Sequence, residues 1–381
     1  MKILAFAFVG VLAYTEAFFL ESDVLAAAGL GKLSLYVAEN GYPNAEQCTL
    51  ENVAIRREWS TLHRSEKLDY IRAVKCLGTK PAKTPAAIAA GAKSRYDDFV
   101  VTHILQAQYT HGNGNFLSWH RYYVWAYEQA LRNECGYKGY QPYYNWPLFA
   151  KNPLRSPLFD GSETSMSGDG AFVPNRTAAC HPNPDRCLVL LQPGSGGGCV
   201  SGPFKNWKVN LGPIRTRSEN VPPNPQADGL GYNPRCIKRD FNKQAANETN
   251  DVRTSTLIKA SHDIASFQDN MQNFFPGVMG VHNGGHYTWG GDAGGDFYNS
   301  PSDPAFWFHH AMIDRTWWVW QNHDLKGRTN VIAGTLTFLN QPPTRNATLD
   351  DIMSLGYVGQ PNITIRNAQS TLGGPFCYIY V

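Results

Sequence analysis

The chain has 381 residues, which allows two or three domains of about 150 residues or one large domain. Charged residues make up only 17% and the formal net charge is +3, so the basic excess that nucleic-acid binding requires is missing. Hydrophobic residues make up 43%, which excludes a disordered chain, and 35 Gly with 24 Pro predict long ordered loops. We therefore expect a loop-rich globular protein.

The N-terminus has the pattern of a secretory signal peptide. Lys2 precedes an apolar run over residues 3–13, which is too short to span a bilayer, and residues 15–17 offer a small-x-small cleavage site. We expect residues 1–17 to be the signal peptide and residues 18–381 the mature, secreted chain. The alternative is a buried N-terminal helix. No other stretch is apolar enough to predict a membrane span.

Cysteines and glycosylation sequons agree with a secreted, extracellular chain. An even number of cysteines in such a chain predicts disulfides but not their connectivity, and here there are eight: Cys48, Cys76, Cys135, Cys180, Cys187, Cys199, Cys236 and Cys377. Four Asn-x-Thr sequons predict N-glycans at some of these positions: Asn175, Asn247, Asn346 and Asn362.

Helical periodicity and capping signals predict a series of helices in chain order. The expected segments are residues 50–77, residues 93–109, Ser118 as N-cap to about Asn133, residues 254–273, a short helix over 282–286, and a helix capped by Ser302 or Asp303 that continues to about His323.

The remaining chain predicts loops and short strands. Residues 150–250 are rich in Gly, Pro and Asn and hold four of the cysteines, without sustained apolar periodicity. We interpret them as a long irregular excursion pinned by disulfides rather than as a separate domain. The tail, residues 330–381, has strand and turn character. The prediction is one mainly α domain over residues 18–381, with disulfide-pinned loops and a few short strands.

Seven of the eleven histidines form two clusters in the sequence, which are His103, His111 and His120, and His282, His286, His309 and His310. On a helix, His282 and His286 lie one turn apart on the same face and can share a metal ion. The pair alone is weak, because two surface histidines give the same pattern. His310 offers a third ligand, and Asp314, one turn further, is predicted to hold an imidazole N–H.

Two trios of imidazoles in one domain predict a binuclear metal site. Three imidazoles without thiolate or carboxylate favour copper or zinc, and paired metals lie about 3.5–4 Å apart. An aromatic environment favours a redox metal that binds a small apolar gas over a hydrolytic one, and the flanking aromatics are Phe116, Trp119, Phe306, Trp307 and Phe308.

These motifs resemble those of the tyrosinases, catechol oxidases and haemocyanins, the binuclear type-3 copper proteins. Residues 103–122, with the loop His-Gly-Asn-Gly-Asn, resemble the first copper motif. Residues 282–286 and 300–315 resemble the second, and residues 142–146 also fit. The ending Tyr-Ile-Tyr at 378–380 resembles the tyrosine motif that closes the catalytic domain of the family. The likeness is greatest to the short secreted fungal members.

The resemblance implies an antiparallel four-helix bundle around two copper ions, without the C-terminal lid domain of latent members. It implies that His309 is a neighbour rather than a ligand, and that the ligands are His103, His111 and His120 for the first copper and His282, His286 and His310 for the second. It further implies small phenolic substrates and oxidation of o-diphenols to o-quinones, with the co-substrate O2 reduced to water. The alternatives are a tyrosinase that also hydroxylates monophenols and an oxygen carrier of the same fold. A binuclear zinc hydrolase is disfavoured because the clusters hold no bridging carboxylate.

The chain departs from the family pattern at several positions, some of which bear on monophenol hydroxylation. Tyr109 occupies the position where many members have the cysteine of a Cys–His thioether. Asn283 matches a residue associated with hydroxylation, but no Glu occurs between residues 262 and 282 to hold a water as base. Phe297, thirteen residues before His310, occupies the position of a bulky gate residue. Ordinary packing is the alternative for Phe297. The missing Glu and Phe297 argue against hydroxylation and Asn283 argues for it, so we expect a preference for o-diphenols.

Overall fold

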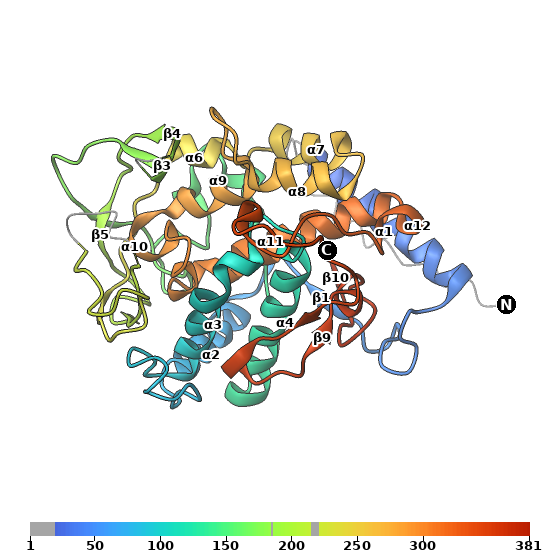
Figure 1. Cartoon of the computed structure of the whole chain (residues 1–381), viewed down its shortest axis with the longest axis horizontal. Coiled ribbons are helices and arrows are strands. Elements are labelled where there is room, and N and C mark those ends of the chain that lie inside the picture. Colours follow the sequence, from blue (N-terminus) through green and yellow to red (C-terminus); the bar gives the residue numbers. More distant parts are fainter. Residues whose placement is uncertain (1–19, 184–185, 215–220) are drawn as a thin grey trace.

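The computed structural model describes residues 20–183, 186–214 and 221–381 (Figure 1). The predicted signal peptide, residues 1–17, lies outside these ranges. The fold is mainly α, as predicted. Its helices are α1 (Glu21–Asn40), α2 (Arg64–Leu77), α3 (Arg95–Thr110), α4 (Phe116–Cys135), α5 (Trp146–Phe149), α6 (Lys243–Asn247), α7 (Asp251–Ala260), α8 (Ile264–Gln272), α9 (Gly280–Trp289), α10 (Gly291–Gly294), α11 (Ala305–His323) and α12 (Leu325–Arg328). None of the helices in the described ranges is long and apolar enough to cross a bilayer.

Short strands form two-stranded sheets. Strands β1 (Ala54–Arg56) and β10 (Tyr378–Tyr380) pair in parallel, which places the segment between α1 and α2 beside the C-terminal end of the chain. The antiparallel pairs are β2 (Gly170–Phe172) with β5 (Gly197–Val200), β3 (Ala179–Asn183) with β4 (Arg186–Leu191), β6 (Lys208–Val209) with β7 (Arg235–Cys236), and β8 (Ile352–Met353) with β9 (Ile363–Thr364). Short 3-10 helices lie in the segments between these elements: η1 (Trp59–Thr61), η2 (Pro153–Arg155), η3 (Ser300–Ser302), η4 (Phe338–Asn340), η5 (Gly356–Val358) and η6 (Arg366–Ala368).

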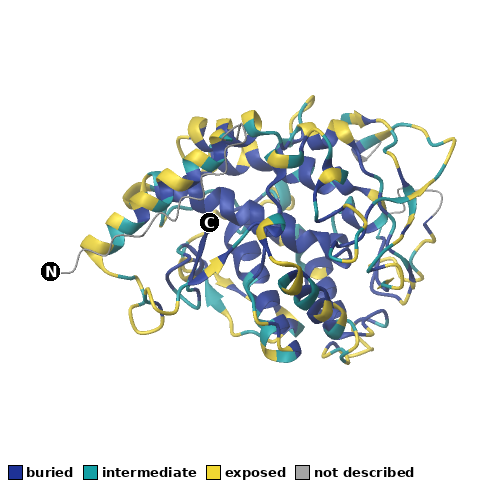
Figure 2. Cartoon of the chain, turned by 180° about the vertical axis from the view of Figure 1, so that it is seen from behind, coloured by how far each residue is buried: buried dark blue, intermediate teal, exposed yellow. Residues whose placement is uncertain are grey.

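Helix α11 is the central element of the bundle. Every residue from Ala305 to Asn322 is buried, because this helix is surrounded by α1, α4, α7 and α9. Figure 2 shows the buried residues concentrated in these inner helices, with exposed positions on the outer ones. Helix α3 packs against α4, and it starts with a capping box of Ser94 and Asp97. These four helices, α3, α4, α9 and α11, carry the clustered histidines.

The helix predicted over residues 50–77 is wrong in its first half. Residues 54–56 form β1 and pair with the distant C-terminal strand, so that Arg56 is buried and Ile55 is exposed. The helix itself begins only at Arg64, where His63 N–H donates to Glu66 Oε2 at 2.8 Å. A partner more than 300 positions away decides the conformation of residues 54–56, and local periodicity cannot reveal it.

Other predicted boundaries need smaller corrections. The helix predicted over 254–273 is two helices, α7 and α8, and Asp263 caps the second by accepting from Ser266 N–H at 2.7 Å. Ser118 is not an N-cap, because α4 already begins at Phe116. Helix α1 was not predicted. Its stripe of small buried residues packs on α11, and a Cβ on Gly29 would lie 3.1 Å from Asn322 Cβ.

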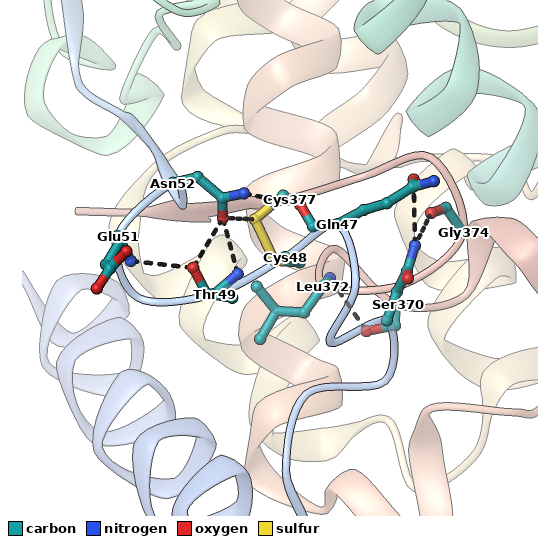
Figure 3. The surroundings of a disulfide bond; sticks show 10 residues. Gln47, Cys48, Thr49, Glu51, Asn52, Ser370, Leu372, Gly374 and Cys377 are labelled. Atoms are coloured by element: carbon teal, nitrogen blue, oxygen red, sulfur yellow. Dashed lines mark hydrogen bonds between the residues drawn. A yellow bond between two sulfur atoms is a disulfide. The ribbon is translucent and has the colours of Figure 1, made fainter.

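Four disulfides pair all eight cysteines. They join Cys48 to Cys377, Cys76 to Cys135, Cys180 to Cys187 and Cys199 to Cys236. The first links the segment after α1 to the end of the chain across 329 positions, and Figure 3 shows Asn52 beside it, where its side-chain oxygen accepts from Thr49 N–H. Cross-links of this kind stabilise a fold by about 2–4 kcal/mol each.

The excursion over residues 150–250 is irregular and disulfide-bonded, as predicted, and it is fastened to the bundle. Arg239 donates two hydrogen bonds of 2.8 Å to Asp303, just before α11, and both side chains are fully buried. Asp240 N–H also donates to Trp289 O at the end of α9. The excursion thereby braces the two helices that carry the second histidine cluster.

Candidate metal centre

The first histidine trio lies where α3 and α4 meet. His103 sits inside α3, His111 is the residue after it, and His120 lies in the second turn of α4. All three are buried, and their ring centroids lie 4.8–5.9 Å apart. One ligand nitrogen from each is within 4.8 Å of the others. The five-residue loop between the helices is thus long enough to turn the chain and short enough to keep the rings together.

Backbone carbonyls fix the tautomer of this trio. His103 Nδ1 lies 2.7 Å from Tyr298 O, and His111 Nδ1 lies 2.9 Å from Ala107 O. His120 Nδ1 lies 2.7 Å from Phe116 O. A carbonyl only accepts, so each Nδ1 carries the proton and each Nε2 presents a lone pair. The Nε2 atoms of His103 and His120 are buried without a hydrogen-bond partner, which fits a cation between them.

The second cluster comes from α9 and α11. His282 and His286 lie one helical turn apart, as predicted, and His309 and His310 face them. The Nε2 atoms of His286 and His310 are 3.1 Å apart. Because His286 Nδ1 donates to Gly294 O at 3.1 Å, its Nε2 is also a lone pair that points at the shared space.

The two clusters face each other across the bundle. The rings of His120 and His310 stack at 4.4 Å with an interplanar angle of 14°, and those of His111 and His282 lie 5.8 Å apart. Ligand nitrogens from four helices therefore converge on one buried space, with no thiolate or carboxylate in either group. This donor set fits a pair of borderline metal ions such as copper.

Burial keeps these imidazoles neutral. Loss of hydration lowers the pKa of His111 from 6.5 to about 4 and that of His286 to about 3. The pKa values of His103, His120, His282 and His310 are also well below 6.5, first because of burial and then because of the neighbouring imidazoles. Only the neutral ring can bind a metal, so the site is prepared for ligation at neutral pH.

Of the five aromatic residues predicted to surround the histidines, three contact a histidine ring and two pack against other aromatic rings. Phe306 stacks on His310 with centroids 4.1 Å apart, and Phe116 contacts His282 at 4.8 Å. Trp119 lies against His120 at 4.9 Å. Trp307 and Phe308 point elsewhere: Trp307 stacks on Tyr127 at 3.7 Å, and Phe308 packs against Trp59 and Tyr70.

The role predicted for Asp314 is wrong. Its carboxylate accepts from Arg121 Nε, Tyr378 OH and Tyr380 OH, each at 2.6 Å, and not from an imidazole. Arg121 follows His120, so the ion pair joins the two ligand helices and acts on the histidines only through the backbone. Arg56 Nη1 completes the network at 3.5 Å. Backbone carbonyls instead hold the imidazoles of four of the histidines, which are His103, His111, His120 and His286. A sequence contains no signal for the position of a carbonyl.

Asn283, the residue linked to hydroxylation, is partly exposed, whereas Gln272, which it contacts, is buried. Asn283 Nδ2 donates to the backbone carbonyl of Gln272, while Gln272 Oε1 accepts from Gly112 N–H at 2.9 Å. This leaves Asn283 Oδ1 free to accept a hydrogen bond and uses one of the two N–H donors of its amide. Gln272, an amide, thus connects Asn283 to the loop that carries His111, a link that the sequence analysis did not identify.

Phe297 and Tyr109 differ in their relation to the metal centre. The Phe297 ring lies 4.9 Å from the His111 ring and is partly exposed, as a gate over the site requires. Its neighbour Tyr298 provides the carbonyl that holds His103. The Tyr109 side chain is 55% exposed on the outside of α3 and so points away from the centre.

This combination of a helical core and two facing histidine groups defines a protein with a candidate binuclear metal site. The family model described as the common central domain of tyrosinase matches residues 93–323. The chain belongs to the tyrosinase family, and its two histidine groups are able to bind the binuclear copper site of that family.

Fungal proteins are among the most similar relatives. The tyrosinase-like protein orsC of Emericella nidulans is 43% identical over 79% of this chain and 83% of its own length. The N-acetyl-6-hydroxytryptophan oxidase ivoB of the same species is 38% identical over 89% and 95%. The solved structure of a polyphenol oxidase variant from Thermothelomyces thermophila superposes with a TM-score of 0.88 at 40% identity, covering 95% of this chain and 98% of that one.

Proposed function

We propose that this member of the family oxidises o-diphenols to o-quinones. In the balanced reaction, two o-diphenols each give up two electrons and two protons, and one O2 is reduced to two molecules of water. The observation that carries the proposal is the placement of Phe297 beside His111, where its ring limits how a phenol can tilt over the site. This restriction disfavours the extra step that a monophenol requires.

We assign the first copper to His103, His111 and His120 and the second to His282, His286 and His310. When bound, the two copper ions supply the redox chemistry that takes electrons from the phenol to O2. The assignment of His310 rather than its neighbour His309 is supported by the short approach of His310 Nε2 to His286 Nε2.

The chain's own residues prepare the site for this reaction. Backbone carbonyls keep three Nδ1 protons in place, so the opposite nitrogens remain ligands throughout. Phe116 and Phe306 cover the histidine rings and exclude water from them. Phe297 presents an aromatic ring on the exposed side, against which the ring of a phenol can pack.

Monophenol hydroxylation is the second candidate, and Asn283 favours it. Its free Oδ1 can accept from a water that would deprotonate the phenol. A carboxylate would make that water a stronger base, but the group that Asn283 contacts is the uncharged backbone carbonyl of Gln272. We therefore expect hydroxylation to be slow. An oxygen carrier would bind O2 reversibly without forming quinone.

Oxygen uptake by the copper-loaded protein separates these functions. Catechol and phenol should be supplied in parallel. A hydroxyindole should be included as a third substrate, because one similar protein is an N-acetyl-6-hydroxytryptophan oxidase. The proposal expects rapid uptake with catechol and a much slower rate with phenol. Equal rates without a lag would establish a tyrosinase, and reversible O2 binding without product would establish a carrier.

We further propose that the protein is secreted and carries N-glycans. The four disulfides fit an oxidising compartment, and the side chains of all four sequon asparagines are exposed: Asn175, Asn247, Asn346 and Asn362. A glycosidase that lowers the apparent mass of the protein from the culture medium would support both points. An unchanged mass, or retention in the cells, would contradict them.

A further inference from the structure

A strained loop lies against the rim of the metal centre. Leu339 and Asn340, in η4, adopt left-handed backbone conformations with φ of 49° and 57°. A leucine disfavours this region strongly, because its Cβ approaches the backbone. Such residues persist only where their surroundings hold them, and they concentrate at ligand-binding sites.

Hydrogen bonds hold this loop on the histidine loop. Leu339 N–H donates to Gly112 O at 3.0 Å, and Gly114 N–H donates to Thr335 O at 2.9 Å. Asn340 Oδ1 accepts from Thr344 N–H at 2.8 Å, which closes the turn on itself. The contact is tight, since a Cβ on Gly112 would lie only 3.0 Å from the Phe338 ring. The strained turn therefore fixes Phe338 relative to the residue after His111.

Phe338 belongs to an aromatic wall that ends at the metal centre. Its ring lies 5.1 Å from Phe297 and 5.4 Å from Phe274, both in edge-to-face geometry. Phe297 in turn lies 4.9 Å from His111. All three phenylalanines are partly exposed, and they come from segments that are well separated in the sequence. The wall runs from the ligand His111 outward, with Phe338 beyond the gate residue.

We propose that Phe338 is a specificity-determining residue that recognises the part of an o-diphenol farthest from the copper ions. A ring that reacts at the metals packs against Phe297, and a second flat apolar group on the same molecule then reaches Phe338. The favoured substrate class is o-diphenols that carry an aryl substituent. This inference rests on the proposed function and names its substrate class.

Matched substrates and matched variants test it. In Phe338→Ala, kcat/KM for 4-phenylcatechol should fall about two- to tenfold, mainly through KM, as loss of one aromatic contact predicts. The value for catechol itself should stay within about twofold, because catechol does not reach Phe338. Phe172→Ala is the control, since Phe172 is an exposed ring on β2. Equal losses for both substrates, or no loss for either, would overturn the proposal.

Two additional measurements test whether an aromatic ring is required at position 338 and whether recognition occurs without turnover. Phe338→Leu retains apolar volume without a ring, so it should still lose discrimination; restoration of the wild-type ratio would contradict recognition by an aromatic face. Calorimetry should show that Phe338→Ala loses affinity for biphenyl-4-carboxylate but not for benzoate. This binding ratio can be measured even if the protein oxidises no diphenol, so failure of the proposed function and failure of this inference remain distinguishable.

Discussion

Around the histidines the chain uses long buried helices and backbone carbonyls, whereas the outer rim of the same site consists of loop segments and strained turns. His103, His120, His286 and His310 all lie within helices, and three of them have a fixed Nδ1. Phe297 lies in the segment between α10 and α11, Phe338 lies in η4, and both are partly exposed. The difference indicates that metal binding depends on the rigid core, while substrate choice depends on loops that can vary independently.

Removal of one ligand should have the largest effect and would test the core half of this comparison. In His286→Ala we expect copper to fall from two ions to one per chain, because the second site retains only two of its three proposed ligands. Catechol oxidation should fall by more than the roughly 100-fold typical of losing an outer partner of a ligand. Elemental analysis with oxygen uptake measures both. His262→Ala, at an exposed histidine, is the control and should change neither.

Acid should destabilise the copper-free protein strongly, because the core keeps its imidazoles neutral. The pKa of His111 is about 4 in the folded chain against 6.5 when unfolded, and that of His286 is about 3. At a pH between the folded and the unfolded pKa, the unfolded chain binds more protons than the folded chain. The contribution of these histidines to the free energy of unfolding is therefore fully present above pH 6.5 and is lost as the pH falls toward 4. Denaturant titrations across pH 4–8 measure this. A free energy of unfolding that is constant between pH 7 and pH 5 would contradict neutral buried imidazoles.

Asp314→Asn should lower the free energy of unfolding by about 3–5 kcal/mol, because it leaves the buried Arg121 without its charge partner. Copper content should remain at two per chain, since no imidazole bonds to this carboxylate. The control is Asp350→Asn in the exposed pair with Arg366, where about 0–1 kcal/mol is expected. Copper loss without loss of stability would instead support the role first predicted for Asp314.

Leu339→Gly should have the smallest effect and would sharpen the rim half of the comparison. Glycine adopts the left-handed conformation without strain, so the free energy of unfolding should rise by about 1 kcal/mol. Leu336→Gly in the same loop should lower it, because Leu336 does not have a positive φ. Thermal denaturation of both variants decides the point. Destabilisation by Leu339→Gly would show that the turn is not strained.

The sequence predicted the helical core and the two histidine groups because both depend on local spacing. His282 and His286 lie one turn apart on helix α9, as their spacing predicted. Helices α3 and α11 were predicted from helical spacing and capping signals, which are local features of the sequence. Strand β1 was missed because its partner lies at the other end of the chain. Asp314 was misassigned because its spacing from His310 fits a ligand partner, while Arg121 and two tyrosines reach it from elsewhere.

The rim could not be predicted for a related reason. The contacts among Phe274, Phe297 and Phe338 join three loops whose relative placement depends on the whole fold. Gly112 was visible only as a loop glycine, although its positive φ and the nearby Phe338 ring explain why a side chain there would not fit.

The ratio of quinone formed to O2 consumed tests the central claim most directly. Protein loaded with two copper ions per chain should produce two molecules of o-quinone from catechol for each O2 consumed, and metal-free protein should produce none. Oxygen that binds reversibly without quinone, or catalysis that continues with zinc in place of copper, would contradict the account.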